Sequence, residues 1–228
     1  MNGNALEKNP DDILSEAATG MGVLLNDTQL SLFYTYHREL LAWNQKINLV
    51  SAKSSLDIPI KHFIDSLTPL PLVLNTSARL LDIGAGAGFP GIPMKIALPS
   101  LKVFLLESSR KKTSFLKHII RTLRLDETTV IHNRVEHLMT DDSYRNGFDI
   151  VISRAAFKLS DLLRISSFFL INNGVIMAMK GGRVTDELKD AVDICETFGL
   201  TYLSCHDIRL PVIHDMRKIV IFKKVATM

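Results

Sequence analysis

The chain has 228 residues, of which 46% are hydrophobic and 22% are charged, and its net charge is +3. This composition is typical of a globular protein that buries its own core without disulfides or metals as staples. The mild positive charge permits a local nucleic-acid-binding patch but does not require one.

Three features of the sequence indicate where in the cell the protein is expected. The two cysteines, Cys195 and Cys205, lack the spacing of a metal site, so we expect both to be reduced and buried in a cytoplasmic protein. The first residues, MNGNALEKNPDD, are polar and acidic, unlike a signal peptide. The apolar stretch at residues 166–179 is broken by Asn172, Asn173 and Gly174, so we expect no membrane-spanning segment.

The first third of the chain is expected to be helical, without strands. We expect residues 1 to about 20 to be loose. Asn26 is placed to cap the next helix, with Gln29 reaching back as in a capping box. That helix, residues 28–45, carries apolar side chains at helical spacing. Short helical pieces follow to about residue 75, punctuated by Pro59, Pro69 and Pro71.

From about residue 78 onward, strands alternate with helices. Strands are expected at residues 79–84, 102–108, 128–134, 148–155 and 174–181. Helices are expected at residues 91–98, 109–125, 135–139, 159–170 and 184–199. The alternation predicts a doubly wound, mostly parallel α/β sheet. The last two of its seven strands, residues 201–208 and 217–224, have no helix between them, so we expect an antiparallel hairpin at the sheet edge.

Glycines crowd the first turn from strand to helix. Such a turn lies at the carboxyl edge of the sheet, where ligands bind, and glycine permits positive φ and close approach of a ligand to the main chain. Gly84, Gly86 and Gly88 form G-x-G-x-G, which suits a nucleoside without phosphate, such as S-adenosylmethionine. Gly86, Gly88 and Gly91 form G-x-G-x-x-G, which suits a dinucleotide. A tight turn that binds nothing is the third interpretation.

Two acidic residues accompany this turn. Glu107 ends the second strand a little over twenty residues after the glycines, where a carboxylate can accept hydrogen bonds from two ribose hydroxyls. Together with the glycines, this position favours a ribose contact over a solvated strand end. Asp82 lies among apolar residues of the first strand and needs donors, which N–H groups of the turn can supply. It either organises the turn or also faces the ligand.

Six segments of the chain match the pattern of one known family. They are HFIDSL (62–67), DIGAGAGFPGIP (82–93), LLESSRKKTSFL (105–116), NRVEHL (133–138), FDIVISRA (148–155) and MKGG (179–182). With these segments the chain resembles the RsmG family, also called the glucose-inhibited division protein B family. These bacterial enzymes use S-adenosylmethionine to methylate N7 of one guanine in 16S ribosomal RNA. The resemblance spans roughly residues 25–225, and GFPGIP is its most specific part.

The resemblance implies a Rossmann-like methyltransferase domain at residues 78–228, with an N-terminal helical extension, residues 1–77, packed on it as one structural unit. It also implies cofactor contacts from Gly84, Phe89, Val135, Glu136 and Arg154. Val135 is equally well explained as core at a helix start, and Glu136 as an acid favoured by the helix dipole. The predicted cofactor-binding set is Gly84, Gly86, Gly88, Phe89, Glu107, Val135, Glu136 and Arg154.

Methylation at guanine N7 needs no general base, because this nitrogen carries a free lone pair. We therefore expect catalysis by positioning N7, the methyl carbon and the sulfur in line. The product guanine is positively charged, and Asp65 is a candidate to stabilise that charge. His62 is a second catalytic candidate, although a structural histidine explains it as well. The HFIDSL segment is expected to bring the helical leader over the mouth of the cofactor site.

Basic residues are expected to contact RNA phosphates, with an affinity that falls as salt rises. Arg110 and Lys111 open a helix, and a solvated helix face explains them nearly as well. Arg134, Lys180 and Arg183 are expected near strand ends at the catalytic edge. The target base must leave its stack or already be unstacked. We expect the partner to be 16S ribosomal RNA or the small ribosomal subunit particle, and the protein to be a monomer that holds no metal.

Two other functions remain open at this point. A nicotinamide-dependent oxidoreductase would use the G-x-G-x-x-G spacing, but little chain remains for a separate substrate domain. An RNA-binding ribosome assembly factor with a vestigial cofactor pocket would keep the basic residues. The intact glycine turn and Glu107 argue against such decay.

Overall fold

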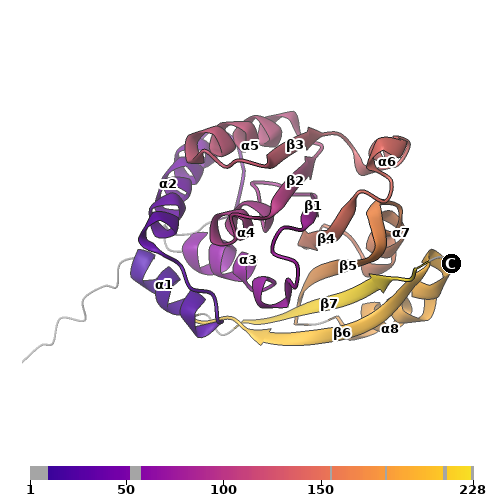
Figure 1. The fold of residues 1–228 in the computed structure, drawn as a ribbon. Helices are drawn as coiled ribbons and strands as arrows, with labels where there is room; N and C mark the ends of the chain where they lie inside the picture. The colour runs from indigo at the N-terminus through magenta and orange to yellow at the C-terminus, as the bar shows by residue number, and fades with distance from the viewer. Residues whose placement is uncertain (1–9, 52–57, 155, 183, 213–214, 227–228) are drawn as a thin grey trace, which may run out of the picture.

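A seven-stranded sheet forms the centre of the protein, with helices on both faces (Figure 1). The computed structural model describes residues 10–51, 58–154, 156–182, 184–212 and 215–226. The strands are β1 (Arg79–Ile83), β2 (Lys102–Glu107), β3 (Thr128–His132), β4 (Phe148–Arg154), β5 (Leu170–Gly181), β6 (Leu200–Arg209) and β7 (Met216–Lys224). Their order is β3-β2-β1-β4-β5-β7-β6. The first five pair in parallel and β7 pairs antiparallel with β5 and β6, which confirms the predicted fold class and edge hairpin.

Successive residues of the central strands enter two different cores. Leu80 faces a core that includes residues of α1 (Pro10–Gly20), α2 (Asp27–Asn44), α4 (Gly91–Ala97) and α5 (Arg110–Leu123). Leu81 faces a second core, formed with α6 (Val135–Leu138), α7 (Leu159–Phe169) and α8 (Thr185–Ile194). Burial on both faces explains why these strands read as continuous apolar runs rather than alternating ones.

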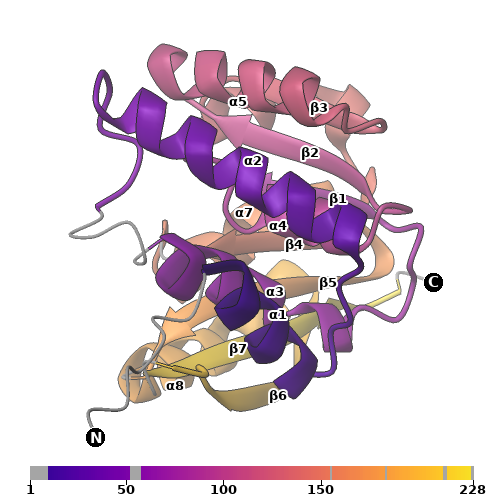
Figure 2. The same cartoon turned by 90° about the vertical axis from the view of Figure 1, so that its left-hand side faces the viewer.

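Helix α1 corrects the expectation that the chain is loose up to about residue 20. Residues 10–20 are helical, while residues 1–9 lie outside the described part of the chain. Leu14, Ala17 and Ala18 are buried on one side of this helix. They pack towards a π-helical segment, Pro59–Ile64, which leads into α3 (Asp65–Leu67) (Figure 2). So short an apolar face forms a helix only when tertiary packing supports it.

Helix α2 joins the N-terminal segment to the glycine turn. Its predicted capping box is confirmed, with Asn26 and Gln29 exchanging backbone-to-side-chain hydrogen bonds of 2.9 Å. Gln29 Nε2 also donates to the carbonyls of Ile96 and Ala97 at the end of α4, both at 2.9 Å. The buried Tyr36 hydroxyl donates to the Ala87 carbonyl, in the turn itself. Figure 2 shows α2 running beside α5, in front of β1 and β2.

Two further expectations concern the burial of the cysteines and the lack of a membrane-spanning segment. Cys195 is buried as expected, whereas Cys205 is only half-buried because it lies on the edge strand β6; both are free thiols. Within the described ranges, every helix is too short or too polar to cross a bilayer.

Candidate functional site

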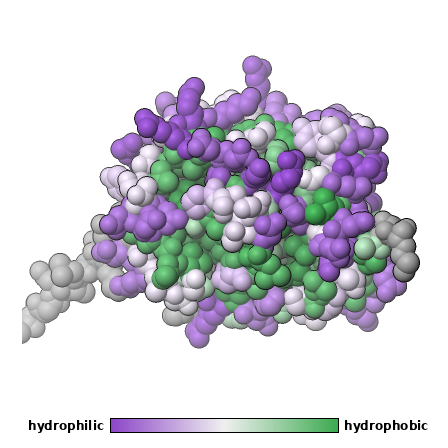
Figure 3. Space-filling model, in the orientation of Figure 1, coloured by the Kyte–Doolittle hydropathy of each residue, from purple (hydrophilic) through white to green (hydrophobic). Residues whose placement is uncertain are grey.

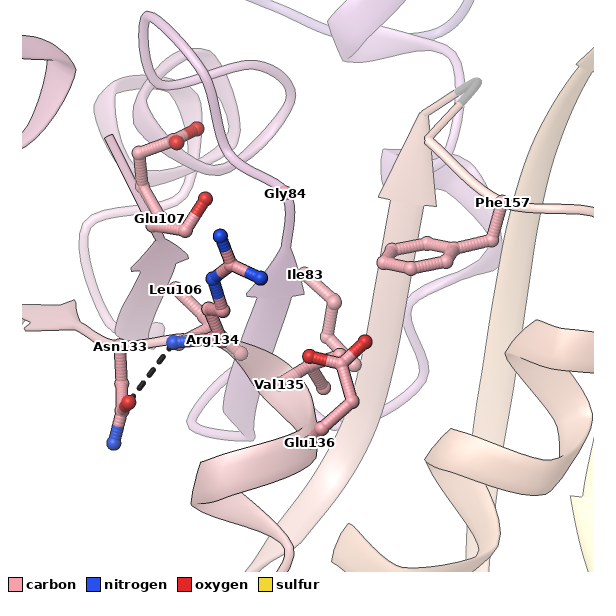
Figure 4. A pocket seen from close by; sticks show the side chains of 10 residues that line it. Ile83, Gly84, Leu106, Glu107, Asn133, Arg134, Val135, Glu136 and Phe157 are labelled. Atoms are coloured by element: carbon pink, nitrogen blue, oxygen red, sulfur yellow. Dashed lines mark hydrogen bonds between the residues drawn. The ribbon is translucent and has the colours of Figure 1, made fainter.

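A cavity of about 260 Å³ opens at the carboxyl ends of β1, β2 and β3; we call it the glycine-turn cavity (Figure 4). It lies beside the point where the strand order reverses between β1 and β4, the usual ligand crevice of such sheets. Its lining residues are Ile83, Gly84, Leu106, Glu107, Ser108, Asn133, Arg134, Val135, Glu136 and Phe157.

Main chain, not side chain, forms one wall of this cavity at Gly84. The residue has φ +77°, and a Cβ there would lie 2.9 Å from Cβ of Ala156. Gly88 has φ +101°, and its Cβ would lie 2.5 Å from Cδ1 of Ile92 and 2.8 Å from the Tyr36 hydroxyl. Both positions therefore require glycine, for conformation and for space.

Glu107 connects the end of β2 to the turn. Its Oε2 accepts a hydrogen bond from Gly86 N–H at 2.9 Å, and its Oε1 accepts one from Ser109 N–H at 2.7 Å. Each carboxylate oxygen has a second lone pair, so these bonds leave acceptor capacity for hydroxyl groups in the cavity. The side chain is held in place before any ligand arrives.

Asp82 accepts a hydrogen bond from the first residue of helix α4. It is fully buried, and its Oδ2 accepts from Gly91 N–H at 2.9 Å, as a turn organiser would. Among the described residues, Oδ1 has no hydrogen-bond partner. Burial raises the pKa of Asp82 to about 7, against the opposing effect of the Gly91 bond. Asp82 does not line the glycine-turn cavity.

The far side of the cavity combines polar and apolar residues. Val135 is 6% exposed and belongs to the second core, while Glu136 is exposed; both stand at the start of α6. Figure 4 shows the Arg134 side chain between Glu107 and Glu136, with Phe157 across from them. Sequence reasoning missed Phe157, although its position just after the fourth strand is where an α/β sheet places ligand contacts.

Phe89 and Arg154 belong to a different group of residues. The Phe89 ring stacks on the His62 ring, with centroids 5.1 Å apart. Arg154 Cζ lies 4.9 Å from the centroid of the Phe89 ring. Arg154 donates from Nη1 to Asp65 Oδ2 at 3.4 Å and from Nη2 to His62 Nδ1 at 3.2 Å. Neither Phe89 nor Arg154 lines the glycine-turn cavity, so their cofactor contacts stay a prediction.

A second cavity, of about 530 Å³, lies over β4, β5 and β7; we call it the Asp65 cavity. Arg217 joins it from the start of β7, with Nε 3.4 Å from Asp65 Oδ1. Burial raises the pKa of Asp65, and Arg154 and Arg217 oppose this rise. The lining residues are Lys61, His62, Asp65, Arg154, Met179, Lys180, Gly181 and Arg217.

Arg217 was not singled out from the sequence, although a physical signal exists. Strand β7 runs antiparallel to β5, and Arg217 pairs with Gly181 at the end of β5. The first residues of a strand antiparallel to β5 therefore return to the carboxyl edge of the parallel strands. A basic residue at that position can reach the same cavity as Arg154.

Lys180 holds a loop in place. Its Nζ donates to the Phe157 carbonyl at 2.6 Å and to Glu187 Oε1 at 2.7 Å. The same oxygen of Glu187 accepts from Leu159 N–H at 2.5 Å. Lys180 and Phe157 also line a third cavity, the Lys180 cavity. This cavity shares Phe157 with the glycine-turn cavity and Lys180 with the Asp65 cavity.

The other basic residues are spread more widely. Arg110 and Lys111 are exposed on the first turn of α5 and line none of these three cavities. Figure 3 shows hydrophilic residues gathered along the edge where α5 lies. Arg134 lines the glycine-turn cavity, while Arg183 lies outside the described residues. Contacts of these residues with RNA stay a prediction.

Known proteins resemble this chain in sequence over most of its length. A family model described as rRNA small subunit methyltransferase G matches residues 29–214. "Ribosomal RNA small subunit methyltransferase G" of Syntrophus aciditrophicus (strain SB) is 50% identical over 213 residues, 93% of this chain and 88% of that protein. The protein with the same name from Acetivibrio thermocellus is 38% identical over 212 residues, 93% of this chain and 87% of that protein.

Solved structures with low sequence identity resemble the fold. TYW2 of M. jannaschii, in complex with AdoMet, has a TM-score of 0.52 at 18% identity, covering 66% of this chain and 71% of that one. Precorrin-6y C5,15-methyltransferase from Geobacter metallireducens GS-15 has a TM-score of 0.54 at 19% identity, covering 78% of this chain and 92% of that one. At such identities the likeness concerns the fold alone.

Proposed function

Because the chain belongs to the rRNA small subunit methyltransferase G family, we propose that it transfers a methyl group from S-adenosylmethionine to N7 of one guanine in 16S ribosomal RNA. The single observation that supports this most directly is the glycine-turn cavity, with bare main chain at Gly84 facing the Glu107 carboxylate. The nicotinamide and vestigial-pocket alternatives are not favoured, because the cavity is intact and the relatives share the methyltransferase name.

The residues of this cavity fit S-adenosylmethionine, which supplies an electrophilic methyl group on sulfur. Glu107 retains acceptor capacity for ribose hydroxyls. Val135 and Phe157 offer apolar surface to an adenine ring, and Gly84 offers main chain without a side chain. We infer that these residues bind the cofactor together with Gly86 and Gly88, whose backbone shapes the turn.

The chemistry places few demands on the side chains. Guanine N7 attacks with its own lone pair, so none of the described residues has to remove a proton. The protein's task is to hold the purine in line with the methyl group and to keep water out, which can lower a barrier by roughly 7–11 kcal/mol in favourable cases. The predicted RNA contacts of Arg110, Lys111, Arg134 and Lys180 would orient the substrate, and a monomeric, cytoplasmic protein stays our expectation.

Transfer of a tritiated methyl group tests the function. The substrates are 16S RNA and small-subunit particles from a strain that lacks this gene. We expect label in one 7-methylguanosine, located by nucleoside mapping, in one or both substrates. A protein that leaves guanine unlabelled in both substrates contradicts the proposal. Thermal shifts should show stabilisation by S-adenosylhomocysteine and none by NADH.

Replacement of Glu107 tests the cofactor site. Glu107→Ala should weaken S-adenosylhomocysteine binding by up to about 2–3 kcal/mol, the scale of hydrogen bonds to a charged group. Calorimetric titration measures this, with Glu127→Ala as the control, because Glu127 is exposed and pairs only with Lys102 among the ion pairs of the described residues. An unchanged dissociation constant in Glu107→Ala would remove Glu107 from the site.

A further inference from the structure

The Asp65 cavity contains a charge cluster that lies outside the glycine-turn cavity. Asp65 comes from α3, Arg154 from the end of β4 and Arg217 from the start of β7. The arginine side chains are 18% and 24% exposed, whereas that of Asp65 is 7% exposed. All three residues line the cavity, and the carboxylate is the most buried of the three charged groups.

We propose that the Asp65 cavity receives the target guanine, that Arg217 donates a hydrogen bond to its O6, and that Asp65 positions both guanidinium groups, while Arg154 keeps its predicted cofactor contact. This inference rests on the proposed function, because it assigns the substrate base of that reaction to a specific place. Asp65 then acts through the arginines and is a positioning residue.

Both arginines keep donors for a ligand. Arg217 contacts Asp65 through Nε, the Met216 carbonyl through Nη1 at 3.1 Å and Asp215 through Nη2 at 3.5 Å. Arg154 contacts Asp65 and His62 through its two terminal nitrogens. A guanidinium has five N–H groups, so the contacts within the described ranges use three in Arg217 and two in Arg154. The remaining N–H groups can donate to an acceptor but cannot accept from another donor.

The chemistry of the reaction selects O6 as that acceptor. Arginine often binds guanine through O6 and N7 together. Here the N7 lone pair must attack the methyl carbon, and a donor placed on N7 would occupy it. O6 is the neighbouring acceptor on the same purine edge. Adenine carries an amino group in its place, which would meet the Arg217 guanidinium group donor to donor, so this contact also discriminates between the purines.

The position of the Asp65 cavity suits a base that meets the cofactor. Phe157 lines both the glycine-turn cavity and the Lys180 cavity. Lys180 lines both the Lys180 cavity and the Asp65 cavity. Strands β1 and β4, which carry Gly84 and Arg154 at their ends, are neighbours in the sheet. Cofactor and base would therefore lie side by side along the carboxyl edge.

A base analogue tests this contact. Small-subunit particles are assembled with 16S RNA that carries 2-aminopurine at the mapped target position, which keeps N7 and lacks O6. We expect Arg217→Gln to lower kcat/KM on guanine by about 10- to 100-fold. On the analogue, the wild-type protein and Arg217→Gln should differ less than about threefold, because the contact is already missing. Any intrinsic difference in N7 reactivity cancels between the two proteins.

Controls separate the base contact from other roles. Arg209→Gln, at an exposed residue of the neighbouring strand β6, should keep kcat/KM within about twofold of wild type. Arg217→Gln should bind S-adenosylhomocysteine with unchanged affinity, because Arg217 does not line the glycine-turn cavity. Asp65→Asn should also erase the difference between guanine and 2-aminopurine, which a purely structural loss of stability would not do.

The outcomes distinguish this inference from the function on which it rests. A wild-type protein that methylates no guanine refutes the proposed function. If the wild-type protein methylates guanine but Arg217→Gln lowers kcat/KM by the same factor on guanine and on 2-aminopurine, only the inference is refuted. If that loss also comes with a shallower salt dependence of RNA binding, Arg217 contacts a phosphate, and the O6 contact is wrong.

Discussion

Asp82 shows how a single residue can be both structural and titratable. Its carboxylate is enclosed between β1 and α4, where one oxygen holds Gly91 N–H and the other has no hydrogen-bond partner in the described part of the chain. A side chain at Gly91 would lie 3.0 Å from Asp82 Oδ2 and 2.5 Å from Leu105 Cδ2, so helix and strand are in close contact here. Burial of an unpaired oxygen penalises the charged form of the carboxyl group.

This carboxyl group should make stability depend on pH. The pKa of Asp82 is raised to about 7 in the folded protein, whereas an aspartate in an unfolded chain titrates near 3.9. Between about pH 4 and pH 7 the folded state holds a proton that the unfolded state has lost. The free energy of unfolding contributed by this group therefore falls as pH rises through that window.

In Asp82→Asn the side chain no longer titrates, so the folded and unfolded states bind the same number of protons at this position. Relative to wild type, the variant should gain stability as pH rises from 4 to 7, on the order of 1.4 kcal/mol per unit of pKa difference. Urea unfolding at several pH values measures the change. Parallel pH profiles for the two proteins would show that Asp82 does not titrate in this range.

At the scale of elements, the Lys180–Glu187 pair joins β5, α8 and the loop that carries Phe157. One ammonium group and one carboxylate oxygen hold the Phe157 carbonyl and the Leu159 N–H. The Lys180 side chain is only 11% exposed, so its contacts are largely shielded from water. This arrangement shows how a residue predicted to bind RNA can also shape the cofactor cavity.

Lys180→Met should loosen this loop. The variant removes the ammonium donor from the Phe157 carbonyl and leaves Glu187 with Leu159 N–H alone. This should lower the free energy of unfolding by about 1–3 kcal/mol and weaken S-adenosylhomocysteine binding. Urea unfolding and calorimetry measure the two effects, with Lys189→Met, at an exposed residue of α8, as the control. If cofactor affinity is retained and only the salt dependence of RNA binding changes, Lys180 serves the RNA instead.

At the scale of the whole molecule, the N-terminal helices and the sheet share one core. Gln29 and Tyr36 bond to carbonyls at the end of α4 and in the glycine turn. Trp43, the single tryptophan of the chain, packs against Phe115 with ring centroids 5.5 Å apart. These contacts support our proposal that residues 1–77 and 78–228 form one structural unit.

One unit should unfold in one step. In urea, Trp43 fluorescence reports the packing of α2 on α5, and far-UV circular dichroism reports the secondary structure of the whole chain. We expect the two transitions to coincide, as for a two-state domain, and S-adenosylhomocysteine to shift both to higher urea by the same amount. Loss of the tryptophan signal at lower urea would instead show that the N-terminal helices form a separate unit.

Local pattern carried the prediction of most elements. The strands at β1 to β5 were expected because apolar runs end at glycine or polar turns, and the capping box at Asn26 is a contact between near neighbours. Helix α1 was missed because Leu14, Ala17 and Ala18 make too small an apolar face to be recognised without its packing partner. Glycine spacing and the position of Glu107 likewise depend on a single turn and the strand beside it.

The sequence by itself determined the alternation of strands and helices, the glycine turn and the acid at the end of β2, because each depends on residues close together in the chain. Only the tertiary structure decided that Asp65, Arg154 and Arg217 meet in one cavity and that Lys180 supports the Phe157 loop. Asp65 and Arg217 stand in segments far apart in the chain, and their distance is set by strand order and by the antiparallel return of β7 beside β5. Those features arise from packing of the whole sheet, which no local pattern contains.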